Sequence, residues 1–221
     1  MTGNRGLETW LRFTASILAS LLATLFLAGS PAFAQTIVDE WATVKAPPPP
    51  ELKPVTIQNV KETAFLVLDI VKQGCNSQRR PRCVASVPKI QKFLEEARAK
   101  GMPVIHSRTT QATAADILPE VAPRPDEPLV ASNADKFVGT DLEKILKEKG
   151  IKTVIVVGTA AHGAVLYTAT GSAYRGFKVI VPVDGMSSEN TYFEQYVAHQ
   201  LVNGPGLAQA VTLTKFDLIR Y

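Results

Sequence analysis

The amino-acid sequence predicts an α/β protein, built on a doubly wound parallel sheet with helices on both faces. Two observations predict this fold class. Apolar runs of strand length alternate with amphipathic stretches of helix length between residues 63 and 214. The first run, TAFLVLDI at Thr63–Ile70, is almost continuously apolar, which is typical of a central parallel strand covered on both faces. Right-handed crossovers would join such strands into one sheet.

The other elements are predicted from the same patterns and from residues that typically start or end helices. Thr140 and Glu143 have the spacing of a capping box, which predicts that a helix starts there. Gly101 and Gly150 stand where helices are expected to end. The expected strands cover 63–70, 103–106, 153–157, 178–183 and 211–214. The expected helices cover 86–100, 140–146, a segment from about Gly163, and 189–201, and residues 109–135 form a long connection.

The first 34 residues have the layout of a signal peptide. Two arginines precede the apolar run 17–27, and Ala32-Phe33-Ala34 provides small residues at cleavage-site spacing, so cleavage is expected before Gln35. An uncleaved anchor helix is the alternative, but the apolar run is shorter than the roughly 20 residues that span a bilayer. The sequence thus predicts export to the periplasm or beyond, an extension at 35–54 with a polyproline spacer, and one domain at 55–221.

Composition restricts the classes of partner. The formal net charge is +4, and the basic residues are mostly spread along helix faces, which gives little support for nucleic-acid binding. After signal cleavage no segment is long and apolar enough to predict a membrane span. Cys75 and Cys83 are the only cysteines, and in an exported protein they favour a disulfide over free thiols. Their spacing lacks companion zinc ligands, so neither a metal nor a cofactor is expected.

Polar residues follow two of the predicted strands at the edge where α/β proteins place their sites. Asp69 ends the first strand, and a short turn containing His162 follows the strand at 153–157. The alternative is that Asp69 is a helix cap or turn residue, but its place at the ligand-binding edge of the sheet favours a functional role. Because the other histidines are far away in sequence, His162 is expected to line a pocket rather than to bind a metal.

The turn and helix after the 153–157 strand resemble the isochorismatase-like cysteine hydrolases, whose pattern here is close to G-x-x-T-x-x-C-V-x-x-T-A. This chain reads GTAAHGAVLYTA from Gly158 to Ala169. The frame matches, but Ala164 occupies the position of the family's nucleophilic cysteine, and a methyl group cannot attack a carbonyl. The resemblance covers about residues 63–214 and implies the isochorismatase-like hydrolase fold.

The resemblance also assigns roles to residues outside this turn. FLVLDI is similar to the family's first motif, which makes Asp69 the catalytic aspartate, the base that deprotonates the cysteine. The second motif places a lysine six residues before a phenylalanine; counting back from Phe137 gives Ala131, so this position is expected to be lost. Lys136 directly precedes Phe137 and is expected to be a plain surface lysine pointing elsewhere, with rescue of the missing role as the alternative.

The resemblance still implies a binding site at the start of this helix. Backbone amides at the start of the helix would bind an anion or a carbonyl oxygen. The family builds its oxyanion hole with a cis peptide bond, which by position would fall at Ala160–Ala161. The expected substrate-binding residues are Ala160, Ala161, His162, Gly163 and Phe137.

Three functions remain open. The first is a pseudoenzyme that binds a small amide-, ester- or carboxylate-containing molecule at the old hydrolase pocket without thiol catalysis. The second is a hydrolase of small amides or esters in which Asp69, assisted by His162, activates water. The third is a structural or interaction module. Relatives with this fold often assemble through their helices, so a homo-oligomer is also an expectation of the resemblance.

Overall fold

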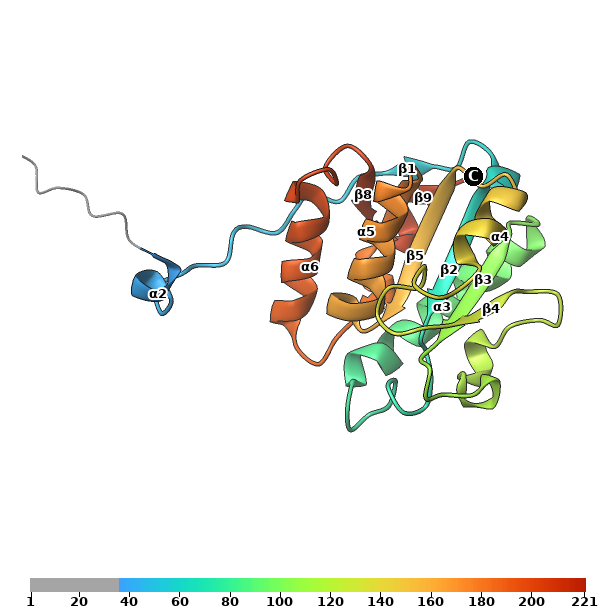
Figure 1. The fold of residues 1–221 in the computed structure, drawn as a ribbon, viewed down its shortest axis with the longest axis horizontal. Coiled ribbons are helices and arrows are strands. Elements are labelled where there is room, and N and C mark those ends of the chain that lie inside the picture. The colour runs from blue at the N-terminus through green and yellow to red at the C-terminus, as the bar shows by residue number, and fades with distance from the viewer. Residues whose placement is uncertain (1–35) are drawn as a thin grey trace, which may run out of the picture. The chain divides into compact units, whose positions relative to one another are not determined.

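The structure is a computed structural model that describes residues 36–221, so the predicted signal peptide lies outside the described residues (Figure 1). The described residues fall into two units, residues 36–46 and 47–221. The described part of the first unit holds the short helix α2 (Ile37–Glu40), where the Asp39 carboxylate accepts the backbone N–H of Thr36 at 2.8 Å. The second unit contains every other element described below.

A parallel sheet of seven strands forms the centre of the second unit, and its order confirms the predicted fold class. The path is β4-β3-β2-β5-β6-β8, with β7 paired to β5, so the chain winds outward in both directions from the central pair β2 and β5. The strands are β2 (Thr63–Leu68), β3 (Val104–Arg108), β4 (Leu129–Ala131), β5 (Thr153–Thr159), β6 (Lys178–Pro182), β7 (Met186–Ser187) and β8 (Val211–Thr214).

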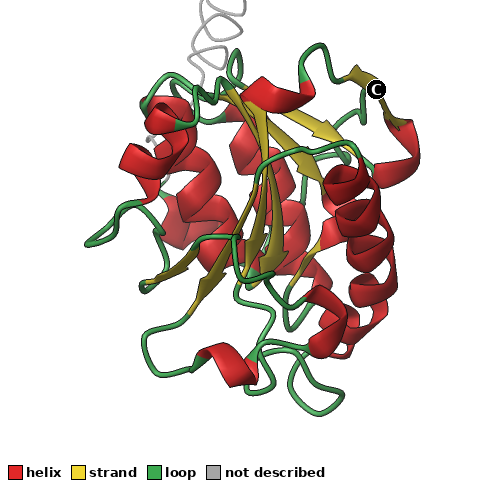
Figure 2. Cartoon of the chain, turned by 90° about the vertical axis from the view of Figure 1, so that its right-hand side faces the viewer, coloured by secondary structure: helices red, strands yellow, loops and turns green. Residues whose placement is uncertain are grey.

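Helices cover both faces of this sheet (Figure 2). One face packs against α3 (Pro81–Ala99), and the other packs against α4 (Leu142–Glu148), α5 (Leu166–Tyr174) and α6 (Thr191–Asn203). Strand β2 is buried along its whole length, and its successive side chains alternate between the two cores: Phe65 faces α3, whereas Leu66 faces the opposite core. This double burial is the physical reason for its continuous apolar run.

Two predicted element starts are wrong. The capping box at Thr140 does not form: α4 begins after Asp141, and Glu143 pairs with Lys147 and Arg175 instead. Thr140 does accept the Leu142 N–H at 3.2 Å, but its own hydroxyl donates to the Lys136 carbonyl at 2.5 Å. Helix α3 begins at Pro81, earlier than residue 86, because proline at the first helical position needs no N–H partner.

The polyproline tract lies on the surface of the domain rather than acting as a free spacer. Gln195 of α6 donates a side-chain hydrogen bond to the Pro47 carbonyl at 3.0 Å, and the Lys53 N–H donates to the Leu213 carbonyl at 2.9 Å. Beyond it, β1 (Val55–Thr56) pairs in parallel with β9 (Ile219–Arg220). Within residues 36–221, no helix combines the length and the apolar character that a membrane crossing requires.

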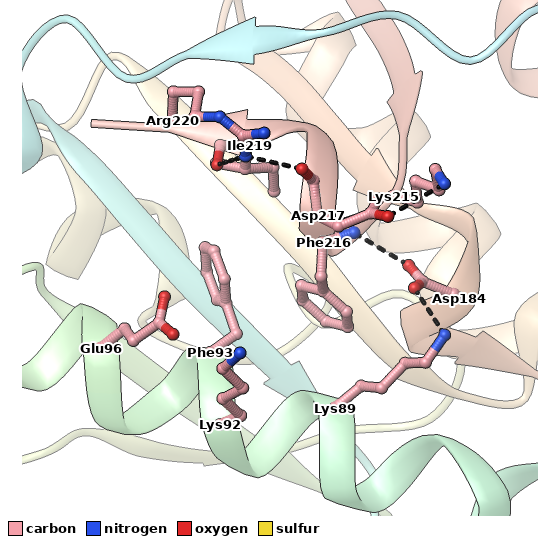
Figure 3. Close-up of a pocket in the computed structure, with 10 residues that line it drawn as sticks. All are labelled: Lys89, Lys92, Phe93, Glu96, Asp184, Lys215, Phe216, Asp217, Ile219 and Arg220. Carbon is pink, nitrogen blue, oxygen red and sulfur yellow. Dashed lines mark hydrogen bonds and ion pairs between the residues drawn. The ribbon is translucent and has the colours of Figure 1, made fainter.

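A surface hollow of about 500 Å³ lies between α3 and the C-terminal segment (Figure 3). Four of its charged side chains form two ion pairs: Lys89 Nζ lies 3.0 Å from Asp184 Oδ2, and Lys215 Nζ lies 3.0 Å from Asp217 Oδ2. The second oxygen of Asp184 accepts the Phe216 N–H at 3.1 Å. Asp184 therefore holds α3 and the C-terminal segment together.

Cys75 and Cys83 form a disulfide, with their Cα atoms 5.3 Å apart, as predicted. We expect a thiol reagent to find no free thiol in the unreduced, denatured protein and two after reduction. Closing so short a loop is worth about 2–3 kcal/mol in the entropic model, so reduction should lower the midpoint of urea unfolding. Two reactive thiols in the unreduced exported protein would contradict the bridge.

Candidate functional site

Asp69 lies at the topological switch point of the sheet, directly after β2 and beside the end of β5. Leu68 is in register with Gly158, so the two strands end together. The backbone of Asp69 has φ 53°, in the left-handed region where non-glycine residues are uncommon outside turns and functional sites. The Ser107 hydroxyl, from β3, donates to Asp69 Oδ1 at 2.7 Å, and only 7% of the Asp69 side chain is exposed.

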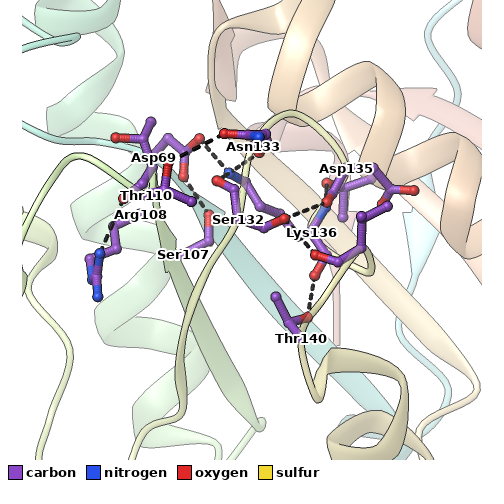
Figure 4. A network of polar contacts seen from close by, with 12 residues as sticks. Asp69, Ser107, Arg108, Thr110, Ser132, Asn133, Asp135, Lys136 and Thr140 are labelled. Carbon is purple, nitrogen blue, oxygen red and sulfur yellow. Dashed lines mark hydrogen bonds and ion pairs between the residues drawn. The ribbon is translucent and has the colours of Figure 1, made fainter.

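Lys136 is fully buried against Asp69, so the expectation of a plain surface lysine is wrong (Figure 4). Its Nζ lies 2.6 Å from Asp69 Oδ2 and also donates to the carbonyls of Ser132 at 3.0 Å and Asn133 at 2.5 Å. The loop after β4 curls around the ammonium group, which brings the side chain back toward the sheet. A lysine ammonium therefore contacts Asp69 from position 136, although position 131 is an alanine.

The buried pair has altered proton affinities. Burial raises the pKa of the Asp69 carboxyl above its usual value, against the opposing effects of the Lys136 ammonium, the Ser107 hydroxyl and the Arg80 charge. Burial likewise lowers the pKa of Lys136, against the opposing effect of Asp69. Asp69 therefore retains a proton more readily than an aspartate in water, which suits a group that gives and takes a proton.

The turn after β5 is held closely against Asp69. Gly158 has φ 133°, and a Cβ atom there would lie 2.0 Å from the Leu68 carbonyl oxygen. A cis peptide bond joins Thr159 to Ala160, one position before the expected Ala160–Ala161 bond. A single π-helical turn, Ala161–Val165, leads into α5, so the helix starts slightly earlier than predicted. Ala164 lies in this turn and is 3% exposed.

Phe137 and His162 occupy different environments. Phe137 belongs to the core, and the Arg175 guanidinium lies 4.2 Å above its ring. A substrate contact by Phe137 therefore stays a prediction. His162 is one-third exposed, stacks on Phe193 at 4.2 Å between ring centroids, and its Nδ1 lies 2.6 Å from the Ser188 hydroxyl. Among residues 36–221, no three His, Cys, Asp or Glu side chains converge as metal ligands would.

The sequence patterns missed two parts of this site. Ser107 is the penultimate residue of β3, next to β2, and directly follows the strand predicted at 103–106, so a search for polar residues after every predicted strand would have found it. Arg80 is buried and pairs with Glu189 at 2.7 Å, although the two are far apart in sequence. A dense basic run, Arg79-Arg80-Pro81-Arg82, lies inside the disulfide loop, but the sequence alone indicates no partner for Arg80.

Comparison with known proteins tests the resemblance directly. The family model of the isochorismatase domain matches residues 63–214, which is well over half of the chain. The chain belongs to the isochorismatase family. A secreted isochorismatase effector of Verticillium dahliae is 34% identical over 149 residues, covering 62% of this chain and 78% of that protein. An N-carbamoylsarcosine amidase of Arthrobacter is 31% identical over 124 residues, covering 43% of this chain and 47% of the amidase.

Solved structures agree with this family membership. An isochorismatase-like hydrolase from Alkaliphilus metalliredigens matches with TM-score 0.64 and 26% identity, over 71% of this chain and 95% of that one. An N-carbamoylsarcosine amidase from Thermoplasma acidophilum matches with TM-score 0.60 and 22% identity, over 71% of this chain and 97% of its own, which supports the fold alone. These family members share the α/β architecture that carries Asp69 and the turn of Ala164.

Proposed function

We propose that this isochorismatase-family domain is a thiol-independent hydrolase in which Asp69 transfers the proton and Lys136 stabilises the carboxylate that results. The observation that carries the proposal is the buried contact of 2.6 Å between Lys136 Nζ and Asp69 Oδ2, beside a turn whose nucleophile position is Ala164. A site that only binds a ligand has no need to bury an ion pair, because the desolvation of two charges is unfavourable. An acid–base site can use such a contact, because the ammonium stabilises the carboxylate that forms when the proton leaves.

The reaction that best fits these groups is hydrolysis of an enol ether, and we propose isochorismate as the substrate. The relative from Verticillium dahliae is described as an isochorismatase. In this chemistry Asp69 would protonate the terminal CH₂ carbon of the enol ether, and water would add to the adjacent carbon. Cleavage of the C–O bond then releases pyruvate and an alcohol. No covalent intermediate is formed, so a cysteine is not required.

The test is turnover of isochorismate by the purified protein, followed as pyruvate release. We expect measurable turnover, and loss of on the order of 10²-fold in Asp69→Asn, the usual range for removal of one acid–base group. Asp184→Asn is the matched control, because Asp184 also follows a strand yet pairs with Lys89 outside the site; its turnover should be unchanged. No turnover above the uncatalysed rate, or equal turnover in Asp69→Asn, would refute the proposal.

A pseudoenzyme that binds a small amide, ester or carboxylate is the second candidate, and the methyl side chain of Ala164 favours it. Saturable binding of isochorismate without turnover would select this alternative. For localisation, the disulfide and the similarity to a secreted effector support the proposal that the chain is exported. Assembly into a homo-oligomer stays a prediction.

A further inference from the structure

Ser188 connects His162 to an acidic residue at the edge of the candidate site. Its hydroxyl lies 2.6 Å from His162 Nδ1 and 3.0 Å from Glu189 Oε2. Ser188 is fully buried, so its hydroxyl has little access to other partners from solvent. Glu189 continues the series, because its other oxygen, Oε1, accepts from Arg80 at 2.7 Å. The series Arg80–Glu189–Ser188–His162 is hereafter called the relay.

The directions of these hydrogen bonds follow from which groups carry a proton that they can donate. Burial raises the pKa of Glu189, but hydrogen bonds, chiefly the one from Arg80, outweigh this effect and lower the pKa to about 2. Near neutral pH the Glu189 carboxylate therefore only accepts hydrogen bonds. Ser188 has a single hydroxyl proton and must donate it to Glu189. It can then only accept from His162, which places the ring proton on Nδ1. The neutral imidazole therefore has its lone pair on Nε2.

Two further contacts fix the orientation of the imidazole. The ring stacks on Phe193, and Nδ1 also lies 3.9 Å from Glu189 Oε2, which favours a proton on that nitrogen. His162 belongs to the same turn as Ala164, two residues earlier, and its side chain is 33% exposed. The basic nitrogen is thus on a residue that solvent can reach and that belongs to the same turn as Ala164.

We propose that Nε2 of His162 is the general base that activates the attacking water, and that the relay holds it in the required tautomer. This inference rests on the proposed hydrolase function. As the water oxygen bonds to the carbon activated by Asp69, its proton passes to Nε2, and His162 then gives that proton to the departing alcohol oxygen. The remaining hydroxyl proton of the hemiketal returns to Asp69, which restores both groups. Ser188, Glu189 and Arg80 are positioning residues.

The relay also explains why Arg80 is buried. Arg80 lies within the Cys75–Cys83 loop, and its Nη1 donates to the Gly74 carbonyl at 3.4 Å. Arg82 in the same loop pairs with Glu194, which accepts the Ser188 N–H at 2.9 Å. Two arginines of one disulfide-closed loop thus hold the segment that contains Ser188 and Glu189.

The tautomer can be measured without any substrate, by two-bond ¹H–¹⁵N correlation spectra of histidine-labelled protein at pH 8.5, above the usual titration range of imidazole. His162→Gln identifies the His162 signals. We expect a protonated Nδ1 and a bare Nε2 in the wild type, and a shift toward the opposite tautomer in Ser188→Ala. Ser187→Ala is the control, because the neighbouring Ser187 hydroxyl is buried and has no hydrogen-bond partner among the described residues.

Activity measurements separate this inference from the proposed function. We expect His162→Gln to reduce isochorismate turnover by on the order of 10²-fold, Ser188→Ala to reduce kcat with little change in KM, and Ser187→Ala to have no effect. A protonated Nε2 in the wild type, or an unchanged tautomer in Ser188→Ala, would overturn the relay. Turnover that is lost in Asp69→Asn but kept in His162→Gln would overturn the base while leaving the proposed function intact. If the wild type shows no turnover, both fail.

Discussion

The substitution Ala164→Cys alone should convert this domain into a thiol-dependent amidase, with at least about a 10³-fold gain over the wild type on an amide substrate. The groups that such a thiol needs are already present. Asp69 lies at the adjacent strand end, and Lys136 supplies the cation at 2.6 Å from it. Burial raises the pKa of Asp69, so the carboxyl can accept and later return the thiol proton.

This expectation reverses the one that follows from the sequence pattern. If Ala131 marked a lost lysine, Ala164→Cys would also need Ala131→Lys to balance the charge that develops in the transition state. Because Lys136 already fills this role, adding Ala131→Lys should give no further gain. The non-additive behaviour expected of residues that act as a unit should instead appear between Ala164→Cys and Asp69→Asn.

N-carbamoylsarcosine and nicotinamide are suitable amides, and ammonia release measures their hydrolysis. Ala164→Ser is the matched control, since it adds a hydroxyl of similar size that is a weaker nucleophile than a thiolate. Iodoacetamide should abolish the new activity and leave the native disulfide untouched. If Ala164→Cys folds, reacts with iodoacetamide and still hydrolyses neither amide, the arrangement of Asp69 and Lys136 is not competent for thiol catalysis on these substrates.

Gly158→Ala should destabilise the domain by more than about 4 kcal/mol, or prevent recovery of folded protein. The added Cβ would lie 2.0 Å from the Leu68 carbonyl oxygen and 2.8 Å from its carbon. These are backbone atoms in the central pair of strands, so relief requires a shift of β2 against β5. The φ of 133° adds strain that an L side chain rarely tolerates.

Urea unfolding followed by circular dichroism measures this effect. Gly150→Ala is the control, because Gly150 also has a positive φ, 67°, but no atom lies within 4 Å of the added Cβ. Its cost should be limited to about 1–2 kcal/mol of left-handed backbone strain. Similar unfolding midpoints for the two variants would show that the close approach of β2 and β5 at Gly158 is not a constraint on folding.

The sequence predicted the sheet well because its signals are local. The continuous apolar run of β2 and the βαβ unit around β5 each depend on neighbouring residues, and parallel strands necessarily end at one edge. Asp69 and the turn of Ala164 were therefore expected at the same edge, and the register of Leu68 with Gly158 confirms it. The disulfide was predicted from the number of cysteines and the expected export.

The parts of the site that the sequence did not predict depend on how loops pack against the sheet. Lys136 was misjudged because its position was counted from Phe137, whereas its direction is set by carbonyls of Ser132 and Asn133 that surround the ammonium group. No periodic pattern encodes such a loop. Arg80 and Glu189 are separated by more than a hundred residues, and their contact depends on the docking of the disulfide loop against the segment after β7. Long-range pairing of this kind cannot be read from one sequence.

The pairing of β1 with β9 has a practical consequence for orientation. It brings residues 55–56 beside residues 219–220, and a surface hollow that includes Val55 and Thr56 is lined by Thr63, Thr153 and Lys178 at the amino ends of three sheet strands. Asp69 and the turn of Ala164 lie at the carboxyl ends, on the opposite edge. A bead, a fusion partner or a cell envelope joined to the domain through either of these segments would leave the edge that carries Asp69 facing outward.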